Sequence, residues 1–74
     1  MSPRLPNVSP RQAVAAFAQA GFKAAGQKGS HIRLVHSNGI QLVIPYHSKD
    51  LKRPLLKSLI KQAGLTEEEF RKLL

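Results

Sequence analysis

The segment 31–44 constrains the fold of this chain most, because two runs of alternating apolar and polar residues flank a turn. The runs are His31–His36 and Ile40–Ile44, with Ser37-Asn38-Gly39 between them. Alternation with a period of two predicts strands with one buried face, and asparagine followed by glycine is typical of a tight turn. The sequence therefore predicts an antiparallel β-hairpin at the centre of the fold.

The register of this hairpin decides which side chains face the core. A two-residue turn would place the apolar residues of the second strand on the face of His31 and Arg33. A three-residue loop with Gly39 in a left-handed bulge pairs His36 with Ile40 instead, and we expect this register because it keeps the apolar residues together. The apolar face then comprises Ile32, Leu34, Ile40, Leu42 and Ile44. The opposite, wetter face carries His31, Arg33, Gln41 and Val43.

A helix is predicted over residues 10–20. Ser9-Pro10 begins it, because serine caps free N–H groups and proline is preset for the first turn. Gly21 ends it with a left-handed residue. Its apolar stripe is expected to contain Val14, Phe17, Ala18 and Ala20.

Two further helices are predicted after the hairpin. One covers about 53–63 and ends at Gly64, with a buried stripe of Leu56, Leu59, Ile60 and Ala63. Thr66-Glu67-Glu68-Glu69 is a capping box that begins the last helix, with Leu65 and Phe70 placed as a hydrophobic staple.

The remaining segments complete an α-β-β-β-α-α order within a single domain over residues 1–74. Residues 1–8 are expected to form an extended lead-in, 22–25 a short first strand, 26–29 a glycine-rich turn and 46–50 a loop after Pro45. This order predicts an α+β fold, a three-stranded antiparallel sheet with helices packed on one face. The other face of the sheet is left open to a ligand.

Charge gives the first indication of function. The chain has 12 lysines and arginines against four acids, a net charge of +8. The acids are Asp50 and the run 67–69, so the first 49 residues contain none. Such an imbalance points to a polyanionic partner, either nucleic acid or an acidic protein. The plain alternative is a basic domain that binds nothing specific.

Composition also excludes several classes of chemistry. Without cysteine there is neither a disulfide, a thiolate metal site nor a cysteine nucleophile. No apolar run has the length of a membrane span, and residues 1–6 lack the order of a signal peptide, so we expect a cytoplasmic protein without a membrane partner. The few acids disfavour paired-carboxylate hydrolysis, and the three histidines lack the spacing of a zinc site, so no metal or other cofactor is expected.

RNA cleavage suits the reactive side chains that remain, because RNA carries its own nucleophile, the 2′-hydroxyl. His31 follows a glycine turn and shares a face with Arg33, and its imidazole suits the role of general base or general acid. Lys28 and Arg33 are cations that would stabilise charge on the phosphate. The plain alternative is that His31 is a surface or structural residue of the strand.

The other two histidines receive different interpretations. His47 extends the face of His31 beyond the third strand, on the diagonal, and is a candidate for a second catalytic or substrate-positioning role. His36 lies at the hairpin end and is interpreted as structural.

A second basic cluster surrounds the start of the helix at 53. It comprises Lys49, Lys52, Arg53 and Lys57. These residues form either a solvated helix face or, with Lys23 and Lys28, a track for a phosphate backbone. Tyr46 is a candidate for stacking on a base.

Four short motifs occur in a recognisable order. They are a helix ending in Gly21-Phe22, then Gln27-Lys28-Gly29-Ser30-His31, then Val43-Ile44-Pro45-Tyr46-His47, and then residues 59–66. In combination they resemble the HicA family of toxin–antitoxin ribonucleases, and the resemblance runs from Leu5-Pro6 to the C-terminus.

The resemblance implies a double-stranded-RNA-binding-like fold and the function of a type II toxin that cleaves mRNA. It also implies neutralisation by a HicB-type antitoxin, with operator DNA reached only through the antitoxin complex. The family's catalytic histidine falls on His31, its signature turn on Gly29 and Ser30, and its second histidine on His47. Arg53-Pro54-Leu55 stands where the family usually carries glycine-threonine-leucine, and Arg53 offers a phosphate contact in place of the threonine.

The sequence thus favours an endoribonuclease with His31 as the catalytic residue. RNA phosphates are expected on Lys28, Arg33, Lys49 and Arg53. The alternative is a non-catalytic RNA-binding module of the double-stranded-RNA-binding type. A third role, as a co-repressor acting through its antitoxin, stays open.

Overall fold

The structure is a computed structural model that describes residues 5–47 and 49–74. Its elements are α1 (Pro10–Gln19), β1 (Phe22–Lys28), β2 (His31–His36), β3 (Gln41–Pro45), α2 (Arg53–Gln62) and α3 (Glu67–Lys72). The predicted α-β-β-β-α-α order and α+β class are confirmed. Residues 1–4 of the predicted lead-in, and Ser48 of the predicted loop, lie outside the described residues.

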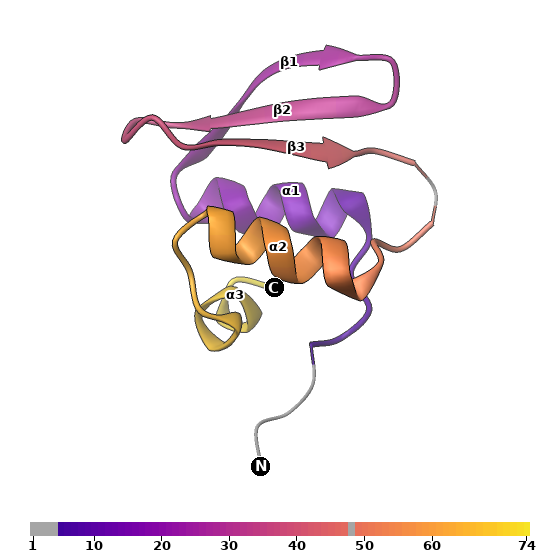
Figure 1. The fold of residues 1–74 in the computed structure, drawn as a ribbon, viewed down its shortest axis with the longest axis vertical. Helices are drawn as coiled ribbons and strands as arrows, with labels where there is room; N and C mark the ends of the chain where they lie inside the picture. Colours follow the sequence, from indigo (N-terminus) through magenta and orange to yellow (C-terminus); the bar gives the residue numbers. More distant parts are fainter. Residues whose placement is uncertain (1–4, 48) are drawn as a thin grey trace.

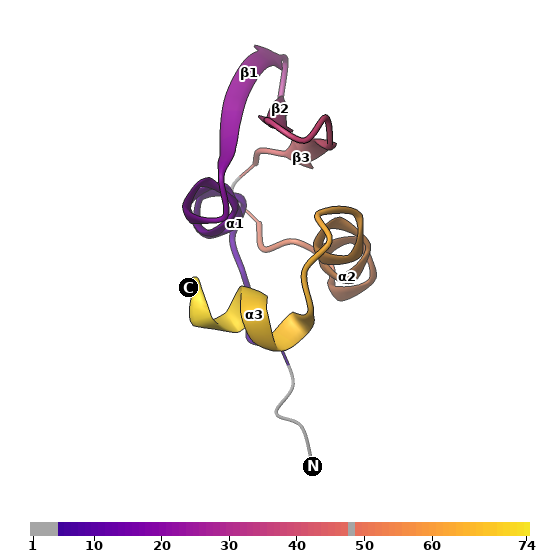
Figure 2. The same cartoon turned by 90° about the vertical axis from the view of Figure 1, so that its left-hand side faces the viewer.

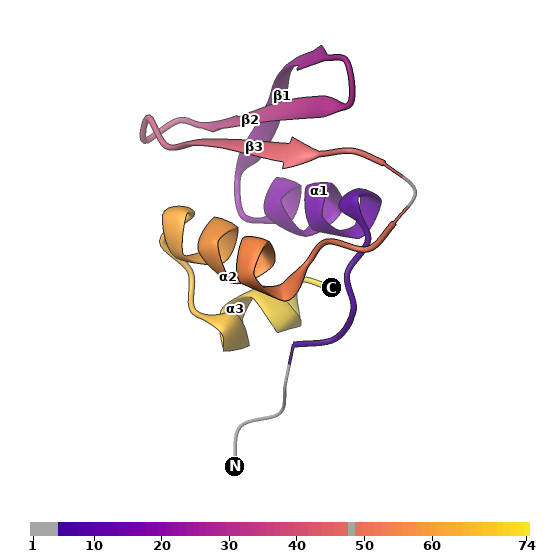
Figure 3. The same ribbon diagram turned by 45° about the vertical axis from the view of Figure 1, so that its right-hand side comes forward.

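The three strands form one antiparallel sheet in the order β1-β2-β3. Helices α1 and α2 lie side by side under one face of this sheet, and α3 lies beyond them as a third layer (Figures 1 and 2). No element of the described chain covers the opposite face, which we call the open face (Figure 3). The predicted packing of the helices on one side is therefore confirmed.

The predicted register of the second hairpin is confirmed. Leu34 lies opposite Leu42, and the His36 N–H donates to the Ile40 carbonyl at 2.9 Å. Gly39 has a φ of 95°, a left-handed conformation that suits glycine. The alternation is preserved in the burial, because the even-numbered residues of β2 and β3 turn toward the helices while the odd-numbered ones face outward.

The predicted end of the first strand was wrong. Residues 26–28 were expected in a turn, but β1 continues through them, and Lys28 lies directly opposite His31. The turn is reduced to the two residues Gly29 and Ser30. A bulge between Ala24 and Gly26 provides the local change of register that lets both ends of the strand pair with β2.

The predicted capping box of α3 is present, and the predicted Ser9 cap of α1 also forms a capping box, with Gln12. The Ser9 hydroxyl accepts from the Gln12 N–H at 3.1 Å, and the Thr66 hydroxyl accepts from the Glu69 N–H at 3.1 Å. The backbone and side-chain hydrogen bonds of Thr66 also lower the pKa of the Glu69 carboxyl. Ala18 was wrongly assigned to the buried stripe, since it is exposed.

The core is one hydrophobic cluster with Phe17 at its centre. The Phe17 ring lies 5.8 Å from that of Phe22 at the start of β1 and 5.1 Å from that of Phe70 in α3. The buried stripe of α1 is completed by Ala13 and Ala16. In α2 the predicted buried residues Leu56, Leu59, Ile60 and Ala63 are confirmed. Phe17 thus joins all three layers of the fold.

The lead-in is part of the core, which the sequence did not predict. Leu5 and Val8 are 2% and 1% exposed. The Val8 carbonyl accepts a hydrogen bond of 2.8 Å from the Leu51 N–H. The segment therefore ties the start of α1 to the loop that follows β3.

We expect Leu5→Ala to lower the free energy of unfolding by about 2–4 kcal/mol, because it leaves a cavity in the core. Urea unfolding followed by circular dichroism measures this loss, with Pro6→Ala, an exposed neighbour, as the control. Equal midpoints for the two variants would show that the lead-in contributes nothing to stability.

Candidate functional site

The turn between β1 and β2 places His31 at the edge of the open face. Gly29 has a φ of 59°, typical of the first position in a type II′ hairpin turn. The Ser30 carbonyl accepts a hydrogen bond from the Tyr46 N–H, which fixes the turn to the chain leaving β3. The glycine and serine of the predicted motif therefore act through the backbone and bring His31 to the first position of β2.

Three rows of paired residues cross the open face. The first row is Lys28, His31 and Pro45, the second is Gly26, Arg33 and Val43, and the third is Lys23, Val35 and Gln41. Three of the four acids lie in the first turn of α3, in the layer farthest from the sheet. The rows hold cations and no carboxylate, so the face is suited to a polyanion.

A pocket of about 400 Å³ opens between the first two rows, and we call it the His31 pocket. Its lining comprises Gly26, Gln27, Lys28, His31, Arg33 and Val43. Gly26 leaves space, since a Cβ there would meet nothing within 4 Å. The Val43 side chain is 51% exposed and gives the pocket an apolar surface beside the charged residues. The structure thus brings together three of the predicted site residues, namely Lys28, His31 and Arg33.

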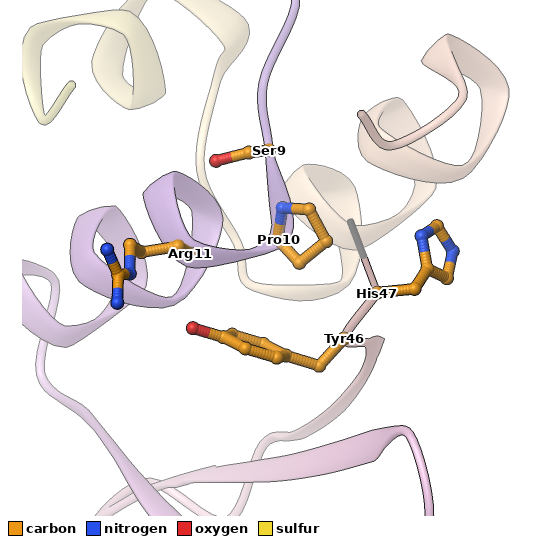
Figure 4. A pocket seen from close by; sticks show the side chains of 5 residues that line it. All are labelled: Ser9, Pro10, Arg11, Tyr46 and His47. Carbon is orange, nitrogen blue, oxygen red and sulfur yellow. The ribbon is translucent and has the colours of Figure 1, made fainter. Parts of the chain in front are cut away.

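His47 lies in a second pocket, of about 440 Å³, which we call the Tyr46 pocket. It is lined by Ser9, Pro10, Arg11, Tyr46 and His47. Figure 4 shows the Tyr46 ring reaching under the first turn of α1, with its hydroxyl on the side of Arg11, while the His47 ring points away from both. His47 therefore does not share the pocket of His31, because β3 ends at Pro45 and the chain turns away from the sheet.

His36 has structural contacts, in agreement with its interpretation. Its ring lies 5.0 Å from that of Phe22 in an edge-to-face arrangement, and its Nδ1 accepts from the Asn38 N–H at 3.1 Å. It also packs against Gly21, where a Cβ would come within 2.7 Å of the imidazole Nε2. The glycine after α1 is thus required both by its φ of 102° and by this contact.

The second basic cluster lies at the start of α2, with Lys49 and Arg53 exposed. Lys52 is the N-cap and makes no side-chain capping bond, and Pro54 sits in the first turn of the helix. In Figure 1 the starts of α1 and α2 lie at the same end of the molecule as the β1–β2 turn and the end of β3. The cations of this cluster thus extend the charge of the open face around that end.

Arg11 is the lining residue that the sequence did not single out. In the sequence it is one of several cations and stands far from Tyr46. Only the packing of α1 against the end of β3 brings the two together. Within the described ranges no group of three histidine or acidic side chains is placed to hold a metal ion. None of the helices described is long and apolar enough to cross a membrane.

A family model described as the HicA toxin of bacterial toxin–antitoxin systems matches residues 10–65. A search of curated proteins found no match. The matched span begins with α1, includes the whole sheet and both pockets except Ser9, and ends before α3, so it is shorter than the resemblance expected from the sequence.

We expect Gly29→Ala to destabilise the protein by about 1–2 kcal/mol, because a Cβ is strained at a positive φ. Gly26→Ala is the matched control, since its φ is not positive and its Cβ meets no atom within 4 Å. Chemical unfolding of both variants gives the comparison. A loss as large in Gly26→Ala would contradict the two-residue turn.

Proposed function

Because the chain belongs to the HicA family of bacterial toxins, we propose that it is an endoribonuclease that cleaves mRNA with His31 as its catalytic residue. The family makes the protein a toxin of a toxin–antitoxin system, with an antitoxin as its partner. The choice of mRNA as substrate, His31 as the catalyst and a HicB-type antitoxin as the partner is our proposal. We also place the activity in the cytoplasm, and contact with operator DNA only through the antitoxin complex.

The observation that carries the proposal is the His31 pocket. The exposed imidazole of His31 lies beside Lys28, its partner on β1. The pair Arg33 and Val43 lies in the next row and lines the same pocket. No hydrogen bond within the described residues engages the His31 ring, so its nitrogens are free to exchange a proton with a substrate. This combination of an unengaged imidazole and adjacent cations is what cleavage through the 2′-hydroxyl needs.

The reaction uses the substrate's own nucleophile. The 2′-oxygen attacks the adjacent phosphorus as its proton leaves, and the bond from phosphorus to the 5′-oxygen of the next nucleotide breaks as that oxygen gains a proton. His31 takes the first proton or supplies the second, and Lys28 and Arg33 stabilise the extra negative charge on the phosphate. The products are a 2′,3′-cyclic phosphate and a free 5′-hydroxyl.

The remaining basic residues and His47 fit substrate binding. His47 lines a different pocket, which favours the substrate-positioning role over a shared proton transfer. Lys49 and Arg53 are exposed at the start of α2 and offer phosphate contacts beyond the cleaved bond. The Gly29-Ser30 turn holds His31 in place through its backbone.

We expect His31→Ala to lower the rate of RNA cleavage at least about 10²-fold, the usual contribution of a general acid or base. Cleavage of labelled single-stranded RNA by the wild-type chain and the variant gives the rates. The ends of the product identify the route, since a 2′,3′-cyclic phosphate results only from attack of the 2′-oxygen. His36→Ala is not a suitable control because the His36 ring packs in the structure, so Lys61→Ala is used.

Thermal unfolding shows whether the His31→Ala chain is folded. Full cleavage by this folded variant would contradict the assignment of His31. RNA binding without cleavage by the wild-type chain would favour the non-catalytic RNA-binding module instead.

Single alanine substitutions of Lys28, Arg33, Lys49 and Arg53 should reduce the salt dependence of RNA binding. Each lost phosphate contact lowers the slope of log K against log salt concentration by about 0.7 for a single strand. Titrations over a range of salt concentrations with a 2′-O-methyl oligoribonucleotide, which the proposed reaction does not cleave, give the slope. An unchanged slope in a variant would remove that residue from the phosphate contacts, with Lys61→Ala again as the control.

A further inference from the structure

The Tyr46 pocket has a lining suited to a nucleotide, and neither the family match nor the proposed catalytic residues account for it. It has an aromatic ring, a guanidinium and an imidazole, and no acid. Tyr46 is only half-buried, and within the described residues its hydroxyl makes no hydrogen bond. An aromatic ring left open beside a cation is a common arrangement for stacking a base and holding its phosphate.

Arg11 supplies the cation of this pocket. It lies in the first turn of α1, which has no acidic residue, and its side chain is exposed. Ser9 holds the helix start in place through the capping box, and Pro10 is buried beneath it, so the position of Arg11 is fixed by the packing of its neighbours. The guanidinium is thus presented to solvent from a rigid helix end.

The two pockets are joined by the backbone. Tyr46 donates its N–H to Ser30, the residue before His31, and His31 lies opposite Pro45, the residue before Tyr46. The Tyr46 pocket and the His31 pocket therefore share one end of the sheet and are held in a fixed relation to each other. A single strand that places its cleaved phosphate at His31 would reach the Tyr46 pocket with a nucleotide farther along the chain.

We propose that the Tyr46 pocket binds a further nucleotide of the single-stranded RNA substrate, beyond the two that flank the cleaved bond, with its base on Tyr46 and its phosphate on Arg11. The inference rests on the proposed function, because it assigns a further part of the same substrate. His47 also lines this pocket, but its ring points away from Tyr46 and Arg11, so the base and the phosphate are held by those two residues. The toxin thus recognises an RNA segment longer than the two nucleotides that flank the cleaved bond.

The test compares long and short RNA in variants of the full chain. The kcat/KM values are measured for dinucleotides and for oligoribonucleotides of about eight nucleotides, both of mixed sequence. The wild-type chain is expected to prefer the long substrate. Arg11→Ala and Tyr46→Leu are each expected to reduce this preference about tenfold, mainly through KM, because the dinucleotide does not fill both pockets.

Two controls keep the result specific. Lys61→Ala removes an exposed cation from the last turn of α2, and it should leave the preference unchanged. Tyr46→Phe keeps the ring but removes the hydroxyl, so it should retain most of the preference if stacking is the main contact. Because Arg11 is exposed, its variant provides the answer even where Tyr46→Leu fails to fold.

The outcomes separate this inference from the proposed function. If His31-dependent cleavage persists while Arg11→Ala has the same preference as the wild-type chain, the second nucleotide site is wrong. If Arg11→Ala weakens binding of an acidic antitoxin but leaves the RNA preference intact, the pocket binds protein instead and the inference is also wrong. Cleavage that persists in the folded His31→Ala chain would contradict the proposed function. Binding of 2′-O-methyl RNA to the Arg11 and Tyr46 variants would still test the pocket in that case.

Discussion

The left-handed conformation of Gly39 determines which side of the sheet each residue of the second hairpin occupies. Its bulge sets His36 against Ile40, and from this pairing every odd-numbered residue of β2 and β3 faces away from the helices. A shift by one residue would bury Arg33 and expose Leu34. The chemistry of the open face and the integrity of the core therefore depend on the same backbone geometry.

The two layers of helices are needed because a chain of 74 residues has little core to spare. Phe17 contacts Phe22 on the sheet side and Phe70 in α3, so the layers are stabilised through one ring. Leu5 and Val8 add apolar area from a segment without regular structure. Because the core forms on the helix side of the sheet, the outward side chains of the open face are not part of it and are available for binding.

The features predicted from the sequence are those fixed by local chemistry. The caps at Ser9 and Thr66 and the loop at Gly39 depend on a few adjacent residues, and the stripe of α2 depends on helical periodicity. The end of β1 was missed because Gly26 and Gly29 are equally good turn residues, and only pairing with β2 distinguishes them. Leu5 and Val8 carry no periodic signal, and the meeting of Arg11 with Tyr46 depends entirely on tertiary packing. Within the candidate site, His31 and Arg33 share a face because both follow from the predicted hairpin register, whereas Lys28 joins them from β1 instead of the predicted turn. His47 depends on a loop.

The position of the acids in α3 gives the molecule an electric polarity. Glu67, Glu68 and Glu69 lie in the layer farthest from the sheet, while the rows of the open face carry only cations among their charged residues (Figure 2). A protein with such a dipole moment is oriented by the field of a polyanion before the two molecules make contact. The open face would then lead the approach to a nucleic acid, so that encounters begin in the orientation in which the His31 pocket meets the strand.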